Sequence, residues 1–386
     1  MILGRAEVMI DIVKPKIKEL FLIPLIAVLP TLLIWLIFYL RLPSFWSIPL
    51  PQSGMATIVS NYDGPLYMVV AKSLYAPGII KGFQFALPVE YYAAHFPLFP
   101  VLIRLFSPIL GTPYSMLAVT VGSTILCLYF FNKLANNYFS RNESLWLTLV
   151  FSVFPARFLI VRSVGSPEPL FLAGIIASIY YFNKKNFWLA GLWGMIATLT
   201  KSPGILLFLA YAIYSFIPKI KNSLAKIYPI LLIPLALAGV FLIFKIRLDD
   251  FWAYFHSGDN IHLIFPPFSI FNYSAPWVGT FWLEEIIFVY LLGAYGTIQL
   301  IKSDKDLGVI PWFTSIFFIV TLMISHRDII RYSLPLVPFL YLAYGNTIIK
   351  KEFKYVFALL IIPIFLFSLA YISQNVMPIS DWSPFL

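Results

Sequence analysis

The chain has 386 residues, of which 60% are hydrophobic, 18% aromatic and only 11% charged. Soluble domains carry about 25% charged residues, so this composition excludes a soluble protein and predicts a single all-α, multi-pass membrane domain over residues 1–386. The net charge of +10 is typical of a lysine excess in cytoplasmic loops, and we expect membrane lipids rather than nucleic acid as partners. Because Cys127 is the only cysteine, no internal disulfide can form.

A membrane-spanning helix needs about 20 mostly apolar residues. Taken in chain order, about eleven apolar runs approach this length: 20–40, 114–131, 144–162, 168–183, 187–200, 203–218, 227–246, 284–301, 309–325, 332–349 and 354–373. The runs at 187–200 and 203–218 are short, so we expect them to be half-buried or to line a cavity.

The distribution of lysine and arginine predicts the orientation of these helices. If the N-terminus is cytoplasmic, alternation of the runs places 16 of the 27 basic residues and 7 acidic residues on the cytoplasmic side. The cytoplasmic side then carries a net charge of +9, and the outer side carries +1. Two long loops, 41–113 and 247–283, face outward in this arrangement.

One apolar segment does not fit the pattern of spans. Residues 96–111 contain Arg104 and three prolines, and counting them as a span would invert the downstream topology. We therefore interpret them as an interfacial or re-entrant helix on the outer side. The first outer loop then carries this helix together with a candidate catalytic residue.

That candidate is Asp63, in the short polar stretch 61–67 soon after the first predicted span. A carboxylate is costly to keep dry beside a bilayer, so a short loop that presents one there suggests a function. The alternative is a turn residue, because Asp often precedes Gly and Pro in turns, as it does here before Gly64 and Pro65.

Four patches resemble, in order and spacing, elements of the GPI mannosyltransferase 2 (PIG-V-like) family, within the GT-C membrane glycosyltransferase superfamily. They are Asn-Tyr-Asp-Gly-Pro-Leu-Tyr-Met-Val-Val-Ala at 61–71, Ala-His-Phe-Pro-Leu-Phe-Pro-Val-Leu-Ile-Arg at 94–104, Ser-Pro-Glu-Pro-Leu-Phe at 166–171 and Ala-Thr-Leu-Thr-Lys-Ser-Pro-Gly at 197–204. Arg-Tyr-Ser-Leu-Pro at 331–335 is similar to the wider superfamily. The family usually has Trp where Tyr62 stands and Arg where Lys201 stands.

The resemblance implies a GT-C-like helical bundle whose active site faces outward. It implies inverting transfer of a sugar, commonly mannose, from a polyprenyl-phosphate donor such as dolichyl-phosphate mannose to a lipid-linked or glycan hydroxyl. Asp63 would be the catalytic base. The expected substrate-binding residues are Tyr62, Tyr67, His95, Arg104, Glu168, Lys201, Arg327 and Arg331. A phosphate leaving group needs cationic donors rather than an acid, which fits the lysine and the arginines in this set.

Each charged candidate also has a structural interpretation. Glu168 could interact with the helix dipole from the first turn of a helix, and Lys201 could extend from a short helix towards the membrane surface. Arg327 and Arg331 could pair with Asp328 and stabilise a loop.

The histidines give no metal site. His95 is as consistent with an interfacial aromatic as with a site residue. His256, Asp259 and His262 have spacings of three and six, which do not share one helix face, so we interpret them as a solvated loop. We assign no metal and no cofactor, and leave metal dependence open.

Two other classes of function remain. A lipid or solute transporter would place charges at mid-membrane and expose polar groups to both faces, whereas here the polar groups gather at one face. A non-catalytic scaffold protein would be expected to have lost motif residues, and Asp63 is intact.

The charge split makes the topology testable. In a background lacking Cys127, Ser53→Cys and Lys221→Cys should react with an impermeant thiol reagent from opposite sides of the membrane, with Ser53→Cys labelled from outside. Labelling of Lys221→Cys but not Ser53→Cys in intact cells would contradict the orientation.

Overall fold

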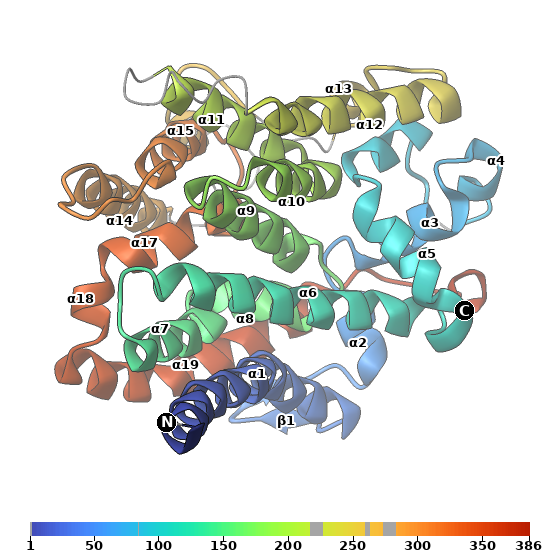
Figure 1. Ribbon diagram of the computed structural model, residues 1–386. Coiled ribbons are helices and arrows are strands. Elements are labelled where there is room, and N and C mark those ends of the chain that lie inside the picture. The colour runs from blue at the N-terminus through green and yellow to red at the C-terminus, as the bar shows by residue number, and fades with distance from the viewer. Residues whose placement is uncertain (1, 84, 217–226, 259–262, 273–282) are drawn as a thin grey trace.

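A computed structural model describes residues 2–83, 85–216, 227–258, 263–272 and 283–386, with side chains described from residue 21 onward (Figure 1). The sites at Lys221, Asp259 and His262 lie outside the described residues. The described chain is mainly helical, and its strands are β1 (Ser44–Phe45) and β2 (Ile48–Pro49), which pair antiparallel.

The first half of the chain begins with the long helix α1 and then forms a run of short helices before α6. Its helices are α1 (Ile2–Tyr39), α2 (Met55–Val59), α3 (Gly64–Ser73), α4 (Pro77–Ile80), α5 (Leu98–Leu110), α6 (Thr112–Ala135), α7 (Arg141–Val153), α8 (Ala156–Ser163), α9 (Glu168–Asn183) and α10 (Phe187–Thr200), with the 3₁₀ helix η1 (Val89–Ala94) before α5.

The second half contains more breaks within its apolar runs. Its α-helices are α11 (Leu206–Ser215), α12 (Leu232–Leu248), α13 (Ala253–His256), α14 (Glu284–Ile301), α15 (Ile310–Leu322), α16 (Ile329–Tyr332), α17 (Val337–Ala343), α18 (Gly345–Ile348) and α19 (Lys351–Gln374). The 3₁₀ helices are η2 (Ser202–Ile205), η4 (Tyr228–Leu231), η5 (Ser269–Phe271), η7 (Leu334–Leu336) and η8 (Ser383–Phe385).

The apolar helices confirm a multi-pass membrane protein. Within the described residues, five helices are long and apolar enough to cross a membrane, or six when α7 and α8 count as one bent span. Several other predicted spans form shorter helices, including α10, α11 and α15. The total of about eleven spans stays a prediction.

Two predicted spans are wrong as continuous helices. The run 144–162 divides into α7 and α8, which are bent by 71°. Pro155 lies between them, and proline can neither donate the backbone hydrogen bond nor tolerate the preceding helical turn. The run 332–349 divides into η7, α17 and α18, preceded by α16. Both breaks matter because α8 and α16 carry charged residues of the site described below.

The predicted interfacial segment forms α5, which has 13 residues and is about 20 Å long at the usual rise per residue. Its Phe99 and Ile103 are buried, while Leu105 and Ile109 are exposed. It packs on α3 and α6. This length is short of the roughly 30 Å hydrocarbon core of a bilayer, which agrees with a helix that does not cross it.

Helices α6, α9, α10 and α12 pack in succession through the centre of the bundle. Helices α2 to α5 gather at one end, at the right of Figure 1, beside the C-terminus, whereas the N-terminus lies at the lower left. After α19 the chain returns to the loop between α2 and α3, where Asn61 and Val376 form a β-bridge. The loop around Asn61 and the segment after α19 therefore build one end of the molecule together.

Candidate active site

The loop that carries Asp63 is fixed by unusual backbone geometry. Tyr62 has a φ of 49°, in the left-handed region that non-glycine residues rarely adopt. Gly64 begins α3 so close to Val59 that a Cβ at this position would lie 2.7 Å from the Val59 carbonyl oxygen. Asp63 occupies the N-cap position of α3, yet its side chain makes no capping hydrogen bond. The carboxylate is therefore directed into a cavity rather than used to cap the helix.

Three other charged residues reach this point from the ends of different helices. Glu168 is the first residue of α9, Lys201 follows α10 directly, and Arg331 lies in α16. The Arg331 Nε donates to Glu168 Oε1 over 2.7 Å, and the Lys201 Nζ donates to the same oxygen over 2.8 Å. Arg331 Nη2 lies 3.3 Å from Asp63 Oδ2. The four side chains form one connected ionic network.

The two carboxylates of this network differ in accessibility. The Asp63 side chain is 32% exposed, whereas that of Glu168 is 4% exposed. Both Glu168 oxygens are occupied, because Oε2 accepts a hydrogen bond from the Ser166 hydroxyl. Within the described part of the chain, Asp63 Oδ1 accepts no hydrogen bond. Of the two, only Asp63 can accept a proton from a molecule in the cavity.

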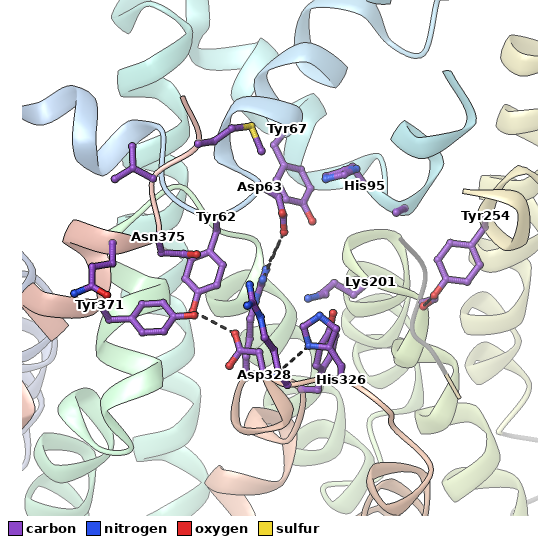
Figure 2. A pocket seen from close by; sticks show the side chains of 18 residues that line it. Tyr62, Asp63, Tyr67, His95, Lys201, Tyr254, His326, Asp328, Tyr371 and Asn375 are labelled. Carbon is purple, nitrogen blue, oxygen red and sulfur yellow. Dashed lines mark hydrogen bonds and ion pairs between the residues drawn. The ribbon is translucent and has the colours of Figure 1, made fainter. Parts of the chain in front are cut away.

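A cavity of about 360 Å³ opens beside Asp63 (Figure 2). It brings together seven of the sequence-predicted site residues: Tyr62, Asp63, Tyr67, His95, Lys201, Arg327 and Arg331. Figure 2 shows Tyr62, Tyr371 and Asn375 on one side of Asp63, and Lys201, His326 and Tyr254 on the other. Arg327 is exposed and forms no ion pair with any described residue.

Two sequence-predicted residues lie off this cavity. Glu168 lies behind it, where it binds the two cations that face the cavity. Arg104 lines a separate cavity and donates to the backbone carbonyls of Ala71 and Lys72 over 3.0 and 2.9 Å. We leave Arg104 out of the candidate site because its guanidinium holds α5 against α3.

A second polar cluster borders the same cavity. Arg157 Nε lies 3.0 Å from Asp328 Oδ1, and Arg157 Nη1 donates to the Tyr62 hydroxyl over 3.1 Å. The Tyr62 hydroxyl in turn lies 3.4 Å from Asp328 Oδ2 and donates to it. Burial, and next the negative charge of Asp328, raises the pKa of Tyr62 well above its usual value, so the hydroxyl keeps its proton. The sequence-based interpretation that Asp328 pairs with Arg327 or Arg331 is therefore wrong. The ion-pair partner of Asp328 is Arg157.

His95 is buried against Tyr67, with ring centroids 4.7 Å apart in an edge-to-face arrangement. Burial lowers the pKa of His95 to about 4; Arg331 and Lys201 also lower it, and Asp63 raises it. The imidazole is therefore neutral near pH 7 and adds no charge to the cavity.

No described group of three or more His, Cys, Asp or Glu side chains could hold a metal ion. His256 instead lies 2.6 Å from Asp250, measured from Nδ1 to Oδ2.

Sequence reasoning missed much of the wall opposite Lys201. Tyr371, Gln374 and Asn375 come from the end of α19, more than 300 residues after Asp63. No motif marks them, and they reach the cavity through contacts with the first loop, among them the pairing of Val376 with Asn61 and the hydrogen bond from Asn61 Nδ2 to the Ile372 carbonyl. Arg157 and Asp328 carry a usable signal in the sequence, because both are charged residues within or beside apolar runs.

Comparisons with protein-family models and with curated proteins find no match for this chain. Among solved structures, ArnT from Cupriavidus metallidurans bound to undecaprenyl phosphate is similar, with a TM-score of 0.58 and 11% identity over 88% of this chain and 63% of ArnT. The same protein in the apo state gives a TM-score of 0.55 and 13% identity over 88% and 62%.

The chain has the fold of the GT-C membrane glycosyltransferases. The sequence-predicted fold class is thereby confirmed. The chain spans less than two thirds of the length of ArnT. At this level of identity the similarity establishes the fold alone.

The pKa of His95 gives a pH-dependent prediction. An unfolded histidine titrates near about 6.5, whereas folded His95 resists protonation until about pH 4. The contribution of His95 to the free energy of unfolding is complete above about pH 6.5. It falls by up to about 1.4 kcal/mol for each pH unit as the pH decreases towards 4.

Thermal unfolding measured between pH 4 and 7 should therefore show a smaller loss of stability at low pH in His95→Phe than in the unmodified protein. Phenylalanine keeps the ring contact with Tyr67 and removes the titration. Parallel stability curves for the two proteins would contradict this assignment.

Proposed function

We propose that the chain is a glycosyltransferase that moves a sugar from a polyprenyl-phosphate donor to a hydroxyl acceptor at the outer membrane face. The observation that carries this proposal is the division of roles in the ionic network. An accessible carboxylate, Asp63, faces two cations that a buried carboxylate, Glu168, fixes in place.

The charge of the cavity suits a sugar phosphodiester. Counting the cavity and the carboxylates and arginine paired at its wall, four side chains are cationic and three are anionic, which leaves one positive charge. The cations are Lys201, Arg327, Arg331 and Arg157, and the anions are Asp63, Glu168 and Asp328. A sugar linked to a polyprenyl phosphate carries one negative charge on its phosphodiester. When the sugar departs, the phosphate gains a second negative charge, and fixed cations stabilise this developing charge most effectively where water is excluded.

In the proposed reaction, the acceptor hydroxyl oxygen attacks the anomeric carbon on the side opposite the phosphate. The new carbon–oxygen bond forms as the bond to the phosphate oxygen breaks, and that electron pair leaves with the phosphate. Asp63 takes the hydroxyl proton. Attack opposite the leaving group inverts the anomeric configuration, so a β-linked donor gives an α-linked product.

The proposed identity of the substrates rests on two similarities, one in sequence motifs and one in fold. The PIG-V-like motifs favour mannose and a lipid-linked or glycan acceptor. The crystal structure of ArnT with undecaprenyl phosphate supports a polyprenyl-phosphate donor for this fold. The orientation, with the N-terminus cytoplasmic and the cavity outside, rests on the charge split between the two sides of the membrane.

Replacing the proposed base should slow transfer without loss of donor binding. Asp63→Asn preserves size and removes proton acceptance, so the rate of mannose transfer from polyprenyl-phosphate mannose to extracted lipids and glycans should fall about 10²–10⁴-fold. Asp249→Asn is the matched control, because Asp249 is exposed and pairs with Lys245 away from the cavity. A near-normal rate in Asp63→Asn would remove Asp63 as the base.

The proposed phosphate site can be tested without knowing the acceptor. Charge-assisted hydrogen bonds are worth about 1.5–3 kcal/mol, so Lys201→Gln, Arg327→Gln and Arg331→Gln should each weaken undecaprenyl phosphate binding about tenfold or more. Arg247→Gln is the control, since among the described residues Arg247 donates to the backbone carbonyls of Ser73 and Leu74, away from the cavity. Unchanged affinity in all three site variants would exclude these residues from a phosphate site.

A further inference from the structure

Arg331 is held on two sides, and the sequence motifs account for only one of them. Glu168 fixes the Nε edge of its guanidinium. The opposite support is the cluster of Tyr62, Arg157, Asp328 and Tyr371, in which each tyrosine ring lies under one arginine guanidinium and the two rings are tilted by 32° to each other. The Arg331 guanidinium lies 4.4 Å from the centroid of the Tyr62 ring, and the Arg157 guanidinium lies 3.9 Å from that of Tyr371.

We propose that Arg157 is a positioning residue, which acts through Asp328 and Tyr62 to hold Arg331 in the orientation that binds the donor phosphate. This inference rests on the proposed function, because it assigns Arg331 to that phosphate. Arg157 itself does not line the cavity.

The first step is the link from Arg157 to the backbone that carries Arg331. Asp328 is the residue directly before α16, and the Arg331 N–H donates to the Asp328 carbonyl over 3.0 Å. Helix α16 begins an apolar helical segment that continues through η7 and α17 to Ala343, so contacts made by Asp328 act on the N-terminal end of that segment, where Arg331 lies. The ion pair between Arg157 and Asp328 joins the start of α16 to α8.

The second step is the link from Arg157 to the Arg331 side chain. Arg157 donates to the Tyr62 hydroxyl, and the Tyr62 ring supports the guanidinium of Arg331. The rings of Tyr62 and Tyr371 are 5.7 Å apart, so the second arginine–tyrosine pair packs against the first. The left-handed backbone at Tyr62 persists because these contacts fix the side chain.

The burial of the cluster makes these contacts effective. The side chains of Arg157 and Asp328 are 11% and 9% exposed, so water and salt screen their ion pair much less than an exposed pair. Only arginine can meet all three partners, because its planar guanidinium stacks on one ring while its edge nitrogens face a carboxylate and a hydroxyl. Lysine at this position would keep the charge and lose the geometry.

The affinity for undecaprenyl phosphate tests the inference in the full-length protein. Arg157→Gln and Arg157→Lys should each weaken binding about tenfold, the scale of one charge-assisted hydrogen bond, although residue 157 cannot touch the ligand. Tyr62→Phe, which keeps the ring under Arg331 and removes the hydroxyl, should have a smaller effect in the same direction. Arg247→Gln, a loss of arginine outside the cluster, should bind normally.

A double-mutant cycle separates positioning from general damage. If Arg157 acts through Arg331, Arg157→Gln should add little to the loss already caused by Arg331→Gln. Additive losses, or normal affinity in both Arg157 variants and in Tyr62→Phe, would overturn the inference.

Hydrogen exchange without ligand distinguishes failure of this inference from failure of the proposed function. Arg157→Gln and Tyr62→Phe should both increase exchange of the amides at residues 329–333 relative to the unmodified protein. Unchanged exchange there would overturn the positioning role even if the ligand binds. If undecaprenyl phosphate fails to bind the unmodified protein, the proposed donor site is wrong. The assignment of Arg331 to the donor phosphate, on which this inference rests, is then wrong as well.

Discussion

The geometry of the cavity depends on the buried carboxylate of Glu168. One of its oxygens receives both Lys201 and Arg331, which come from distant parts of the chain, and its other oxygen receives Ser166. A buried charge is tolerated only when it is paired and hydrogen-bonded, so this carboxylate requires both cations to be present. The same requirement keeps two positive charges at the cavity wall, where an anionic substrate can meet them.

Asp63 and Glu168 both contact Arg331, but the Asp63 side chain is much less buried than that of Glu168. Its longer separation from Arg331, 3.3 Å against 2.7 Å for Glu168, indicates a weaker contact that a bound anion can replace. A phosphate that takes over part of Arg331 would leave Asp63 free to accept a proton. In the proposed reaction, binding of the donor and release of the base would thus be connected through one guanidinium.

The breaks in the helices give the site its shape. An unbroken helix over 144–162 would have no bend at Pro155, and Arg157 would not lie beside Asp328. Likewise, α16 begins the segment that continues as η7 and α17, and its first turn brings Arg331 to Glu168. Short, bent elements at the membrane surface allow charged side chains to converge while the long helices remain apolar.

The sequence by itself determined the class of protein and many of the residues at the cavity. Apolar runs can only form helices in a membrane, because every backbone polar group there must be satisfied within the segment. Asp63, Glu168, Lys201 and Arg331 were recognisable because charged residues beside such runs are rare. The sequence also placed Arg104 with them, since its chemistry is the same and it lies in the same predicted loop as Asp63.

Only the tertiary structure decided which charges meet. The hydrogen bonds of Arg104 to the Ala71 and Lys72 carbonyls, the pairing of Arg157 with Asp328, and the contribution of Tyr371 and Asn375 all depend on contacts between segments far apart in the chain or turned by a break in a helix. A local pattern carries no information about such contacts, because it records residue type and spacing but not the direction in which a loop folds back. The charge balance of the cavity, and therefore its proposed chemistry, follows from that direction.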